Sequence, residues 1–145
     1  MYRKSLADQS CSIARSLDVV GEWWTLLILR DAFRGIRRFD DFLDSLGIAR
    51  NVLSVRLAKL VDHGILERRA LPEHAGRHEY RLTEKGQDLQ AVVISLMAWG
   101  DRWTAVDEDP PVVLTHAGCD HDARPVLTCG HCGGHLDPRN VRRRG

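Results

Sequence analysis

Cysteine and histidine residues gather near the end of this chain, at spacings that could hold a metal ion. Two residues separate His116 from Cys119, and two separate Cys129 from Cys132, which glycines follow. Thiolate and imidazole ligands in two such pairs suit tetrahedral Zn²⁺, and four protein ligands leave no open position for catalysis. The sequence therefore predicts structural zinc as a cofactor, bound by His116, Cys119, Cys129 and Cys132 in a small zinc-ribbon-like tail.

Alternatives remain open for this tail. His121 could replace His116 as a ligand, and a lone Cys-x-x-Cys pair is often a redox pair or accidental. The connection between Cys119 and Cys129 has nine residues, fewer than in many ribbons. The apolar residues of the tail are few, namely Val112, Val113, Leu114, Val126, Leu127 and Leu136. Because so small a set cannot form a core, metal would have to fold the tail.

The remaining cysteine, Cys11, stands alone near the start of the chain, just before an expected helix over residues 12–19. The dipole and free amides of a helix N-terminus can lower the pKa of a thiol and make it reactive. Cys11 is therefore a candidate redox sensor. In the alternative interpretation it is a small buried residue at a dimer interface, since Arg15 is the only basic residue placed to hold a thiolate.

The composition excludes several classes of protein. The 145 residues are enough for one domain, and 43% hydrophobic with 28% charged residues excludes wholesale disorder and fibrous repeats. No signal pattern opens the chain, and the longest uncharged stretch, residues 89–100, is too short to span a bilayer. We therefore expect a cytoplasmic protein without membrane partners. The sequence shows no set of residues that could supply a nucleophile, a general base and a substrate pocket together. We therefore expect that the protein is not an enzyme.

Hydrophobic spacing predicts the elements that must position these residues. They are helices over residues 12–19, 22–33, 39–46 and about 50–62, strands over 65–71 and 78–82, and a last helix from the N-cap Thr83 to about Trp103. The third and fourth helices are joined by a tight turn containing Gly47. This order is that of a winged helix-turn-helix, a mainly α fold with a small β-hairpin (α+β).

The predicted organisation has five parts. They are an arm over residues 1–10, a winged-helix domain over 11–104, an acidic linker over 105–111, the metal-binding tail over 112–137 and a basic end over 138–145. The net charge of +1 hides a division, because residues 50–85 carry eight basic and five acidic side chains. From residue 87 onward there are six basic and eight acidic side chains. The basic segment is the expected partner of a polyanion.

The chain resembles the HxlR-type regulators, which are dimeric bacterial winged-helix transcription factors. The resemblance rests on CSI at 11–13, WTLLILR at 24–30, RRF at 37–39, LSVRL at 53–57 and EYRLTEKG at 79–86. It implies a homodimer built from the N-terminal segment and the last helix, whose apolar stripe is wider than one domain needs. It also implies that Cys11 could sense oxidants or electrophiles, as an N-terminal cysteine does in some members. Ala49 departs from the Ser or Thr that usually opens the recognition helix, and a lost cap costs about 1 kcal/mol.

The fourth helix is the expected recognition helix. With its leucines turned inward, the residues Arg50, Asn51, Ser54 and Val55 are candidate base readers in the major groove of double-stranded DNA. Arg56 and Lys59 are expected towards phosphate, as are Arg37 and Arg38 ahead of the third helix. In the hairpin loop, Arg77 and His78 are the candidate contacts of the wing. The alternative for Arg50 and Arg56 is solvent or an intramolecular pair with Asp40, Asp41 or Asp44.

These features predict a DNA-binding transcriptional regulator, a repressor, acting as a homodimer on a pseudo-palindromic operator, with an oxidant or small molecule as effector. The rival is a zinc-ribbon adaptor whose winged domain binds protein. A third hypothesis keeps DNA binding and adds an effector pocket between Trp23, Trp24 and the dimer helix. In the alternative interpretation, these tryptophans pack in the core and in the dimer interface.

Overall fold

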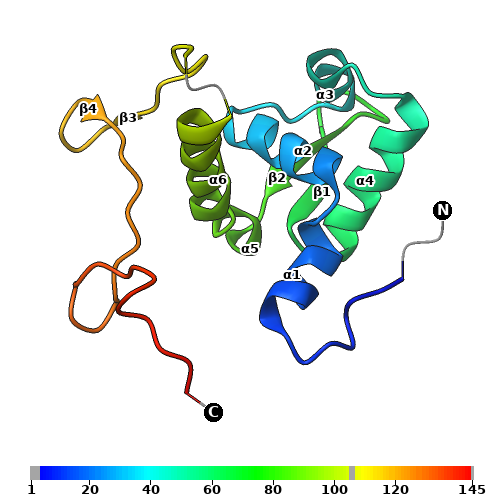
Figure 1. The fold of residues 1–145 in the computed structure, drawn as a ribbon. Helices are drawn as coiled ribbons and strands as arrows, with labels where there is room; N and C mark the ends of the chain where they lie inside the picture. Colours follow the sequence, from blue (N-terminus) through cyan, green and yellow to red (C-terminus); the bar gives the residue numbers. More distant parts are fainter. Residues whose placement is uncertain (1–3, 105–106, 145) are drawn as a thin grey trace. The chain divides into compact units, whose positions relative to one another are not determined.

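The computed structural model of the chain describes residues 4–104 and 107–144 (Figure 1). Residues 1–3 of the predicted arm, residues 105–106 of the predicted linker and Gly145 of the predicted basic end lie outside the described residues. The chain divides into two compact units, Met1–Val93 and Ile94–Gly145. The boundary falls within the last helix.

The first unit begins with the four predicted helices, α1 (Ser12–Val20), α2 (Trp23–Phe33), α3 (Phe39–Leu46) and α4 (Arg50–Asp62). Local signals set their ends. The carboxylate of Glu22 caps α2 by accepting a hydrogen bond from the Thr25 amide at 3.2 Å. Gly47 ends α3 in the left-handed conformation, with φ of 61°, which a residue with a side chain rarely adopts. The tight turn from Gly47 to α4 makes the helix-turn-helix.

A hydrophobic cluster holds these helices together. It consists of Val20, Ile28, Leu29, Phe42, Ile48, Leu53, Leu57, Leu60, Ile65 and Leu66. α2 contacts α3, α4 and the second strand of the hairpin, which explains why this helix is apolar almost all round (Figure 1). Leu53, Leu57 and Leu60 of α4 are buried, as the sequence predicts. The opposite face of α4 is therefore free to contact a ligand.

One buried charge ties α2 to α3. The Asp31 carboxylate is fully buried and accepts hydrogen bonds from Arg30 Nε and from Ser45 Oγ, each at 2.8 Å. A buried carboxylate is costly unless it is paired, so these donors are required for the fold. The contact fixes α3 against the core, immediately ahead of the recognition helix.

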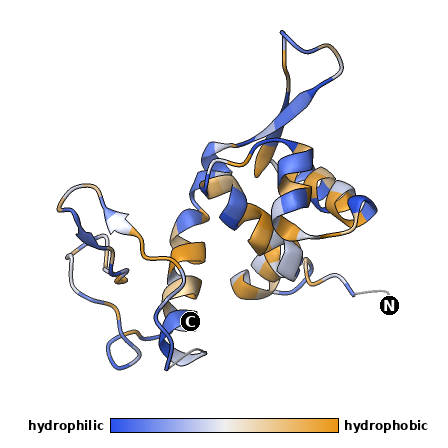
Figure 2. Ribbon diagram, turned by 90° about the horizontal axis from the view of Figure 1, so that it is seen from above, coloured by the Kyte–Doolittle hydropathy of each residue, from blue (hydrophilic) through white to orange (hydrophobic). Residues whose placement is uncertain are grey.

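The wing is an antiparallel hairpin of β1 (Leu66–Ala70) and β2 (His78–Leu82), in which Arg68 lies opposite Tyr80. It protrudes from the helices, and its strands are mostly hydrophilic (Figure 2). The segment before α3 makes no strand of its own, and a backbone hydrogen bond from the Tyr80 amide to the Arg37 carbonyl, at 2.7 Å, joins it to the wing. This bond anchors the base of the wing beside the start of α3.

The last helix differs from the prediction, because two helices, α5 (Glu84–Gln87) and α6 (Gln90–Trp103), replace the continuous one. Thr83 is the predicted N-cap and accepts from the Gly86 amide at 3.1 Å. The Leu89 amide then bonds to the Gly86 carbonyl, three residues back instead of four, and this tighter turn interrupts the α-helix. Hydrophobic spacing alone carries no sign of that local change in hydrogen bonding.

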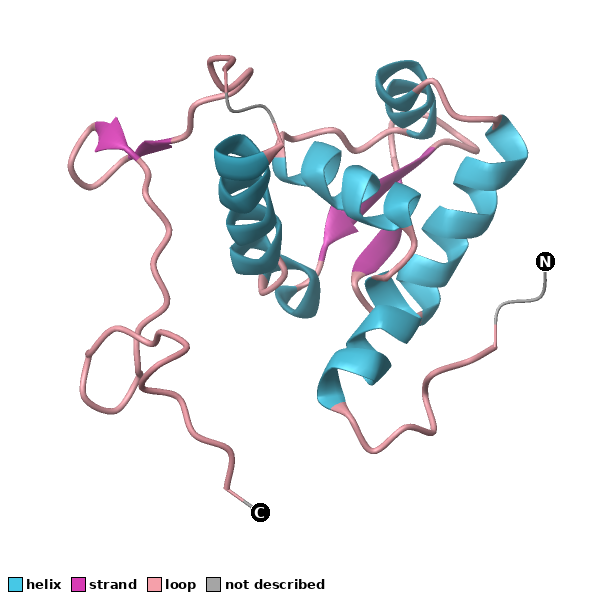
Figure 3. Ribbon diagram, viewed as in Figure 1, coloured by secondary structure: helices cyan, strands magenta, loops and turns pink. Residues whose placement is uncertain are grey.

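The second unit beyond α6 is mostly loop, with two short antiparallel strands, β3 (Thr115–His116) and β4 (His121–Asp122) (Figure 3). Residues 94–104 and 107–144 include no buried side chain. The six apolar residues of the tail therefore form no core in the described structure, as the sequence indicates.

Candidate nucleic-acid interface

The N-terminal turns of α4 present polar side chains to solvent. Arg50, Asn51 and Ser54 are exposed, and Val55 is 51% exposed. Ala49 stands at the N-cap with no side-chain hydrogen bond to the helix. The first amides of α4 thus lack a side-chain cap, and a helix N-terminus with free amides favours an anion such as phosphate.

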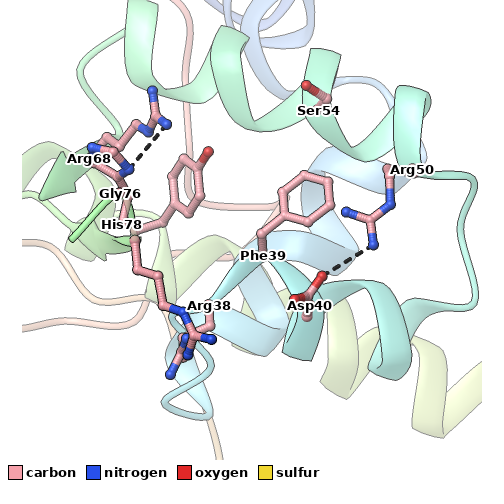
Figure 4. Close-up of a pocket in the computed structure, with 10 residues that line it drawn as sticks. Arg38, Phe39, Asp40, Arg50, Ser54, Arg68, Gly76 and His78 are labelled. Atoms are coloured by element: carbon pink, nitrogen blue, oxygen red, sulfur yellow. Dashed lines mark hydrogen bonds and ion pairs between the residues drawn. The ribbon is translucent and has the colours of Figure 1, made fainter. Parts of the chain in front are cut away.

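A shallow groove of about 440 Å³ lies between α3, the start of α4 and the wing (Figure 4). Its lining brings together five of the predicted DNA-binding residues, which are Arg38, Arg50, Ser54, Arg77 and His78. Phe39, Asp40, Arg68, Gly76 and Tyr80 complete the lining. The groove therefore carries four arginines against one carboxylate, a charge balance that attracts a polyanion. Asn51 lines an adjoining hollow with Phe39, Arg50 and Ser54.

Arg50 is held in position by two neighbours from α3. Its Nη2 donates to Asp40 Oδ1 at 3.2 Å, and its guanidinium lies 5.1 Å from the centroid of the Phe39 ring. Figure 4 shows the arginine turned towards Asp40 beside the phenyl ring. The ion pair is exposed to solvent and so is worth little by itself, while the aromatic contact restricts where the guanidinium can go.

The wing supplies a second set of basic groups. Arg68 Nη2 lies 3.2 Å from His78 Nδ1 across the hairpin (Figure 4). Arg77 is exposed and directly follows Gly76, whose φ of 77° turns the chain back towards β2. The loop is closed by hydrogen bonds from the Leu71 amide to the Arg77 carbonyl and from the Arg77 amide to the His74 carbonyl. Arg77 is thus carried on an ordered turn.

The other predicted contacts lie elsewhere. Arg56 is paired with Glu22, its Nε 3.2 Å from Glu22 Oε2, and both side chains are mostly buried. Lys59 lines the same cleft as Arg56, between the N-terminal arm, α1, α2 and α4. Arg37 is exposed but does not line the groove. Arg50 makes the predicted intramolecular pair with Asp40, whereas Arg56 pairs with Glu22 and not with one of the three predicted aspartates.

Sequence reasoning missed the contributions of Arg68 and Tyr80 to the groove. The register that pairs them across the wing places both on one face of the hairpin. Strand alternation, counted from the groove-lining His78, would have found them, since Tyr80 is two residues further along the same strand.

Cys11 is exposed and stands at the N-cap of α1, where its side chain makes no capping hydrogen bond. Of the two tryptophans at the start of α2, Trp24 packs against the core, whereas Trp23 is 80% exposed. No helix in the described ranges is both long enough and apolar enough to cross a membrane.

The predicted metal ligands form two close pairs. His116 Nδ1 lies 3.4 Å from Cys119 Sγ. In the second pair, the Cys132 amide, the His131 amide and the Cys132 thiol donate hydrogen bonds that lower the pKa of the Cys129 thiol below its usual range. Within residues 4–104 and 107–144 the two pairs do not come together into a cluster of three or more ligands.

Two proteins with similar sequences are named as HTH-type transcriptional regulators. The HTH-type transcriptional regulator Rv3095 of Mycobacterium tuberculosis is 49% identical over 130 residues, which cover 90% of this chain and 82% of the relative. YodB of Bacillus subtilis, also an HTH-type transcriptional regulator, is 35% identical over 89 residues, covering 61% of this chain and 80% of the relative.

Solved structures that are similar to this chain are also named as regulators or transcription factors. The crystal structure of PA1607, a candidate transcription factor, is similar with a TM-score of 0.87 and 34% identity, covering 97% of this chain and 99% of that one. The redox regulator HypR in its oxidised form is similar with a TM-score of 0.59 and 29% identity, covering 63% of this chain and 96% of that one.

The family model of the HxlR-like helix-turn-helix matches residues 19–108, which contain α2, the helix-turn-helix, the wing and α6. The match confirms the resemblance seen in the sequence and the winged fold. The chain therefore belongs to the HxlR-like helix-turn-helix family of DNA-binding transcriptional regulators.

Proposed function

We propose that this regulator binds a pseudo-palindromic operator as a homodimer and represses the promoters that it occupies. The observation that carries the proposal is the basic groove, in which the N-cap of α3, the start of α4 and the wing present Arg38, Arg50, Arg68 and Arg77 on one surface. A winged helix with its recognition helix free at the N-terminal turns can enter a major groove while the wing follows the backbone.

Each part of the groove has a task in this proposal. Arg50 forms two hydrogen bonds to a guanine, Asn51 contacts an adenine and Val55 meets a thymine methyl. To reach DNA, the Arg50 guanidinium leaves Asp40 while its contact with the Phe39 ring guides it. Arg77 and Arg38 contact phosphate, which sets orientation and affinity without selecting sequence.

Exposed apolar surfaces support the homodimer. On α1, Ile13 and Leu17 are exposed. The exposed large side chains of α6 are Val92, Leu96, Trp99 and Trp103. Large apolar side chains gathered on one exposed helix face of a small protein mark an interaction surface. Two copies related by a two-fold axis would place their recognition helices in half-sites about one helical turn, or a multiple of it, apart.

A gel-shift titration with the intergenic DNA next to the gene tests the assignment. Arg50→Ala is expected to lose specific binding by about 10- to 100-fold, the value of a bidentate base contact. Arg56→Ala is the matched control on the same helix, because Arg56 is paired with Glu22 and not in the groove. Equal losses for the two variants would contradict the proposed reading surface.

We also infer an oxidant as effector, acting through Cys11. Its exposure at the start of α1 allows a reagent to reach the thiol. The similarity to the redox regulator HypR supports the same inference. Peroxide should release wild-type protein from the operator and leave Cys11→Ser bound. Release of both, or of neither, would remove Cys11 from the mechanism.

A further inference from the structure

The second unit carries a repeated backbone feature that the DNA-binding function does not use. Residues 116–120 and residues 129–133 fold into two tight turns of the same form. In the first, the Asp120 amide donates to the His116 carbonyl at 2.8 Å. In the second, the Gly133 amide donates to the Cys129 carbonyl at 2.7 Å. Each turn thus closes over five residues and has a histidine or cysteine, both able to bind Zn²⁺, at its first and fourth positions.

The resemblance extends to backbone conformation. The fifth residue of each turn has a positive φ, 56° at Asp120 and 73° at Gly133. In the described part of the chain, Asp120 is the only residue other than glycine with a positive φ. A left-handed aspartate costs free energy that a glycine does not, so a compensating interaction is expected at this position.

Strand pairs close each turn from outside. The first turn lies inside the β3–β4 hairpin, in which His116 pairs with His121. The second is flanked by an antiparallel bridge between Thr128 and His135 and by a hydrogen bond from the Cys129 amide to the Gly134 carbonyl at 2.8 Å. Both are short hairpins that hold two ligand side chains on one loop.

Glycines leave room for the ligand side chains in both turns. Next to the second turn, a Cβ added at Gly134 would lie 3.4 Å from Cys132 Sγ. In the first turn the His116 ring lies over Gly118, where an added Cβ would come within 2.8 Å of the ring. The absence of a side chain at 118 leaves room for His116 and Cys119 to approach one another.

We propose that these two turns are the halves of one tetrahedral zinc site, with His116, Cys119, Cys129 and Cys132 of the same chain as ligands. Three thiolates and one neutral imidazole suit Zn²⁺, and each thiol releases its proton to solvent on binding. We assign His116 as the histidine ligand because its ring already lies beside the Cys119 thiol, with Nδ1 3.4 Å from Sγ. His121 bonds the Cys119 carbonyl through Nδ1, which leaves its Nε2 free, and the variants below therefore test both histidines.

The segment between the turns permits them to meet. Within the described tail, residues 124–126 make no backbone hydrogen bond, whereas the Ala123 amide and the Leu127 carbonyl on either side are bonded. Ligand sulfurs on one zinc ion lie about 4 Å apart, so the chain must reverse between the turns. Residues 124–127 form no turn in the described structure. A β-turn over these residues would supply the reversal when the metal binds and would place Pro125 at its second position, where proline is favoured.

Titration of the reduced, metal-free full-length protein with Co²⁺ alone tests the proposal. We expect one ion per chain, the visible bands of tetrahedral Co²⁺ and sulfur-to-metal charge transfer from three thiolates. Zn²⁺ should then displace the Co²⁺. An octahedral spectrum, two ions per chain, or no binding would overturn the proposal.

Variants identify the ligands. Cys119→Ser and Cys129→Ser should each lower the charge-transfer intensity by about one-third, from three thiolates to two. His116→Cys should preserve tetrahedral binding and raise that intensity by a similar fraction. Cys11→Ser and His121→Ala are controls that should bind as wild type does. Loss of binding in His121→Ala with retention in His116→Ala would overturn the choice of histidine.

A mixing experiment separates one chain from two. Neither the double variant His116→Ala with Cys119→Ser nor the double variant Cys129→Ser with Cys132→Ser should bind one tetrahedral Co²⁺. If all four ligands come from one chain, an equimolar mixture of the two double variants should also show no tetrahedral Co²⁺ spectrum. Recovery of the tetrahedral spectrum in the mixture would show ligands from two chains and overturn the intrachain site. Unchanged far-ultraviolet circular dichroism of the variants would verify that the winged helix remains folded.

Discussion

The two units of this protein achieve order by different means. The first unit has a cluster of ten buried apolar residues around α2 and α4, to which each of the helices α1 to α4 contributes. The second unit has no buried side chain in residues 94–104 and 107–144, yet its tail forms the same tight turn twice, at residues 116–120 and 129–133. Burial of apolar surface stabilises the fold of the first unit, whereas we propose that a metal ion stabilises the fold of the tail. The function of each unit follows: one holds arginines in a fixed groove and the other holds thiols on loops.

The largest test of this contrast compares one leucine from each unit. Leu57→Ala removes a fully buried side chain from the core and should lower the free energy of unfolding by about 2–5 kcal/mol. Leu127→Ala, at a residue that is 70% exposed, should change it by less than about 0.5 kcal/mol. Urea denaturation followed by circular dichroism measures both. A comparable loss for Leu127→Ala would mean that the tail has an apolar core after all.

A pair of glycines sharpens the contrast further. At Gly86 a Cβ would lie 2.2 Å from the Ile65 carbonyl oxygen, so Gly86→Ala should force a backbone shift costing about 1–3 kcal/mol. Gly100 lies in the last turn of α6, where an added Cβ would meet Thr104 Oγ1 at 3.8 Å, an ordinary van der Waals distance. Gly100→Ala should therefore stabilise α6 by about 0.5–1 kcal/mol. Thermal melting of the two variants should shift in opposite directions, and a shift in the same direction would contradict this account.

The buried aspartate gives a test of similar size within the first unit. Ser45→Ala removes the hydroxyl that donates to Asp31 and should cost about 1–3 kcal/mol, because a buried acceptor loses a partner. Ser54→Ala, at an exposed groove residue, is the matched control and should cost less than about 0.5 kcal/mol. Denaturant midpoints that coincide for the two variants would show that Asp31 does not depend on Ser45.

The smallest effect concerns charge in the groove. Asp40→Asn frees Arg50 from an exposed ion pair and removes the carboxylate of the groove lining, so affinity for any DNA should rise by at most about fivefold. Glu108→Gln in the linker makes the same charge change outside the groove and should leave affinity unchanged. Fluorescence anisotropy at low salt can resolve this difference. Weaker binding by Asp40→Asn would mean that Asp40 orients Arg50 for DNA and does not compete with it.

Much of the fold could be predicted from sequence, because its signals are local or periodic. The leucines at 53, 57 and 60 marked the buried face of α4, and Gly47 marked the turn before it. The break between α5 and α6 could not be predicted, since it depends on the Leu89 amide bonding to Gly86.

The candidate site was predicted only in part, for a different reason. Arg50 opens the recognition helix and Arg77 lies in the wing loop, and the structure places both in the lining of the groove. Arg56 was expected at phosphate, but its pairing with Glu22 joins α4 to the cap of α2, a contact between residues far apart in sequence. Such pairs depend on how helices pack, and no spacing rule encodes them.

We propose that α4 and the wing read DNA through the groove, with Arg50 selecting a base. The affinities of wild type and Arg50→Ala for a set of operators, in which each base pair is changed in turn, test this directly. Wild type should lose about 1–3 kcal/mol of binding free energy on changing one base pair in each half-site, and Arg50→Ala should no longer distinguish that pair. If Arg50→Ala discriminated at every position as wild type does, Arg50 would not read the operator and the claim would be wrong.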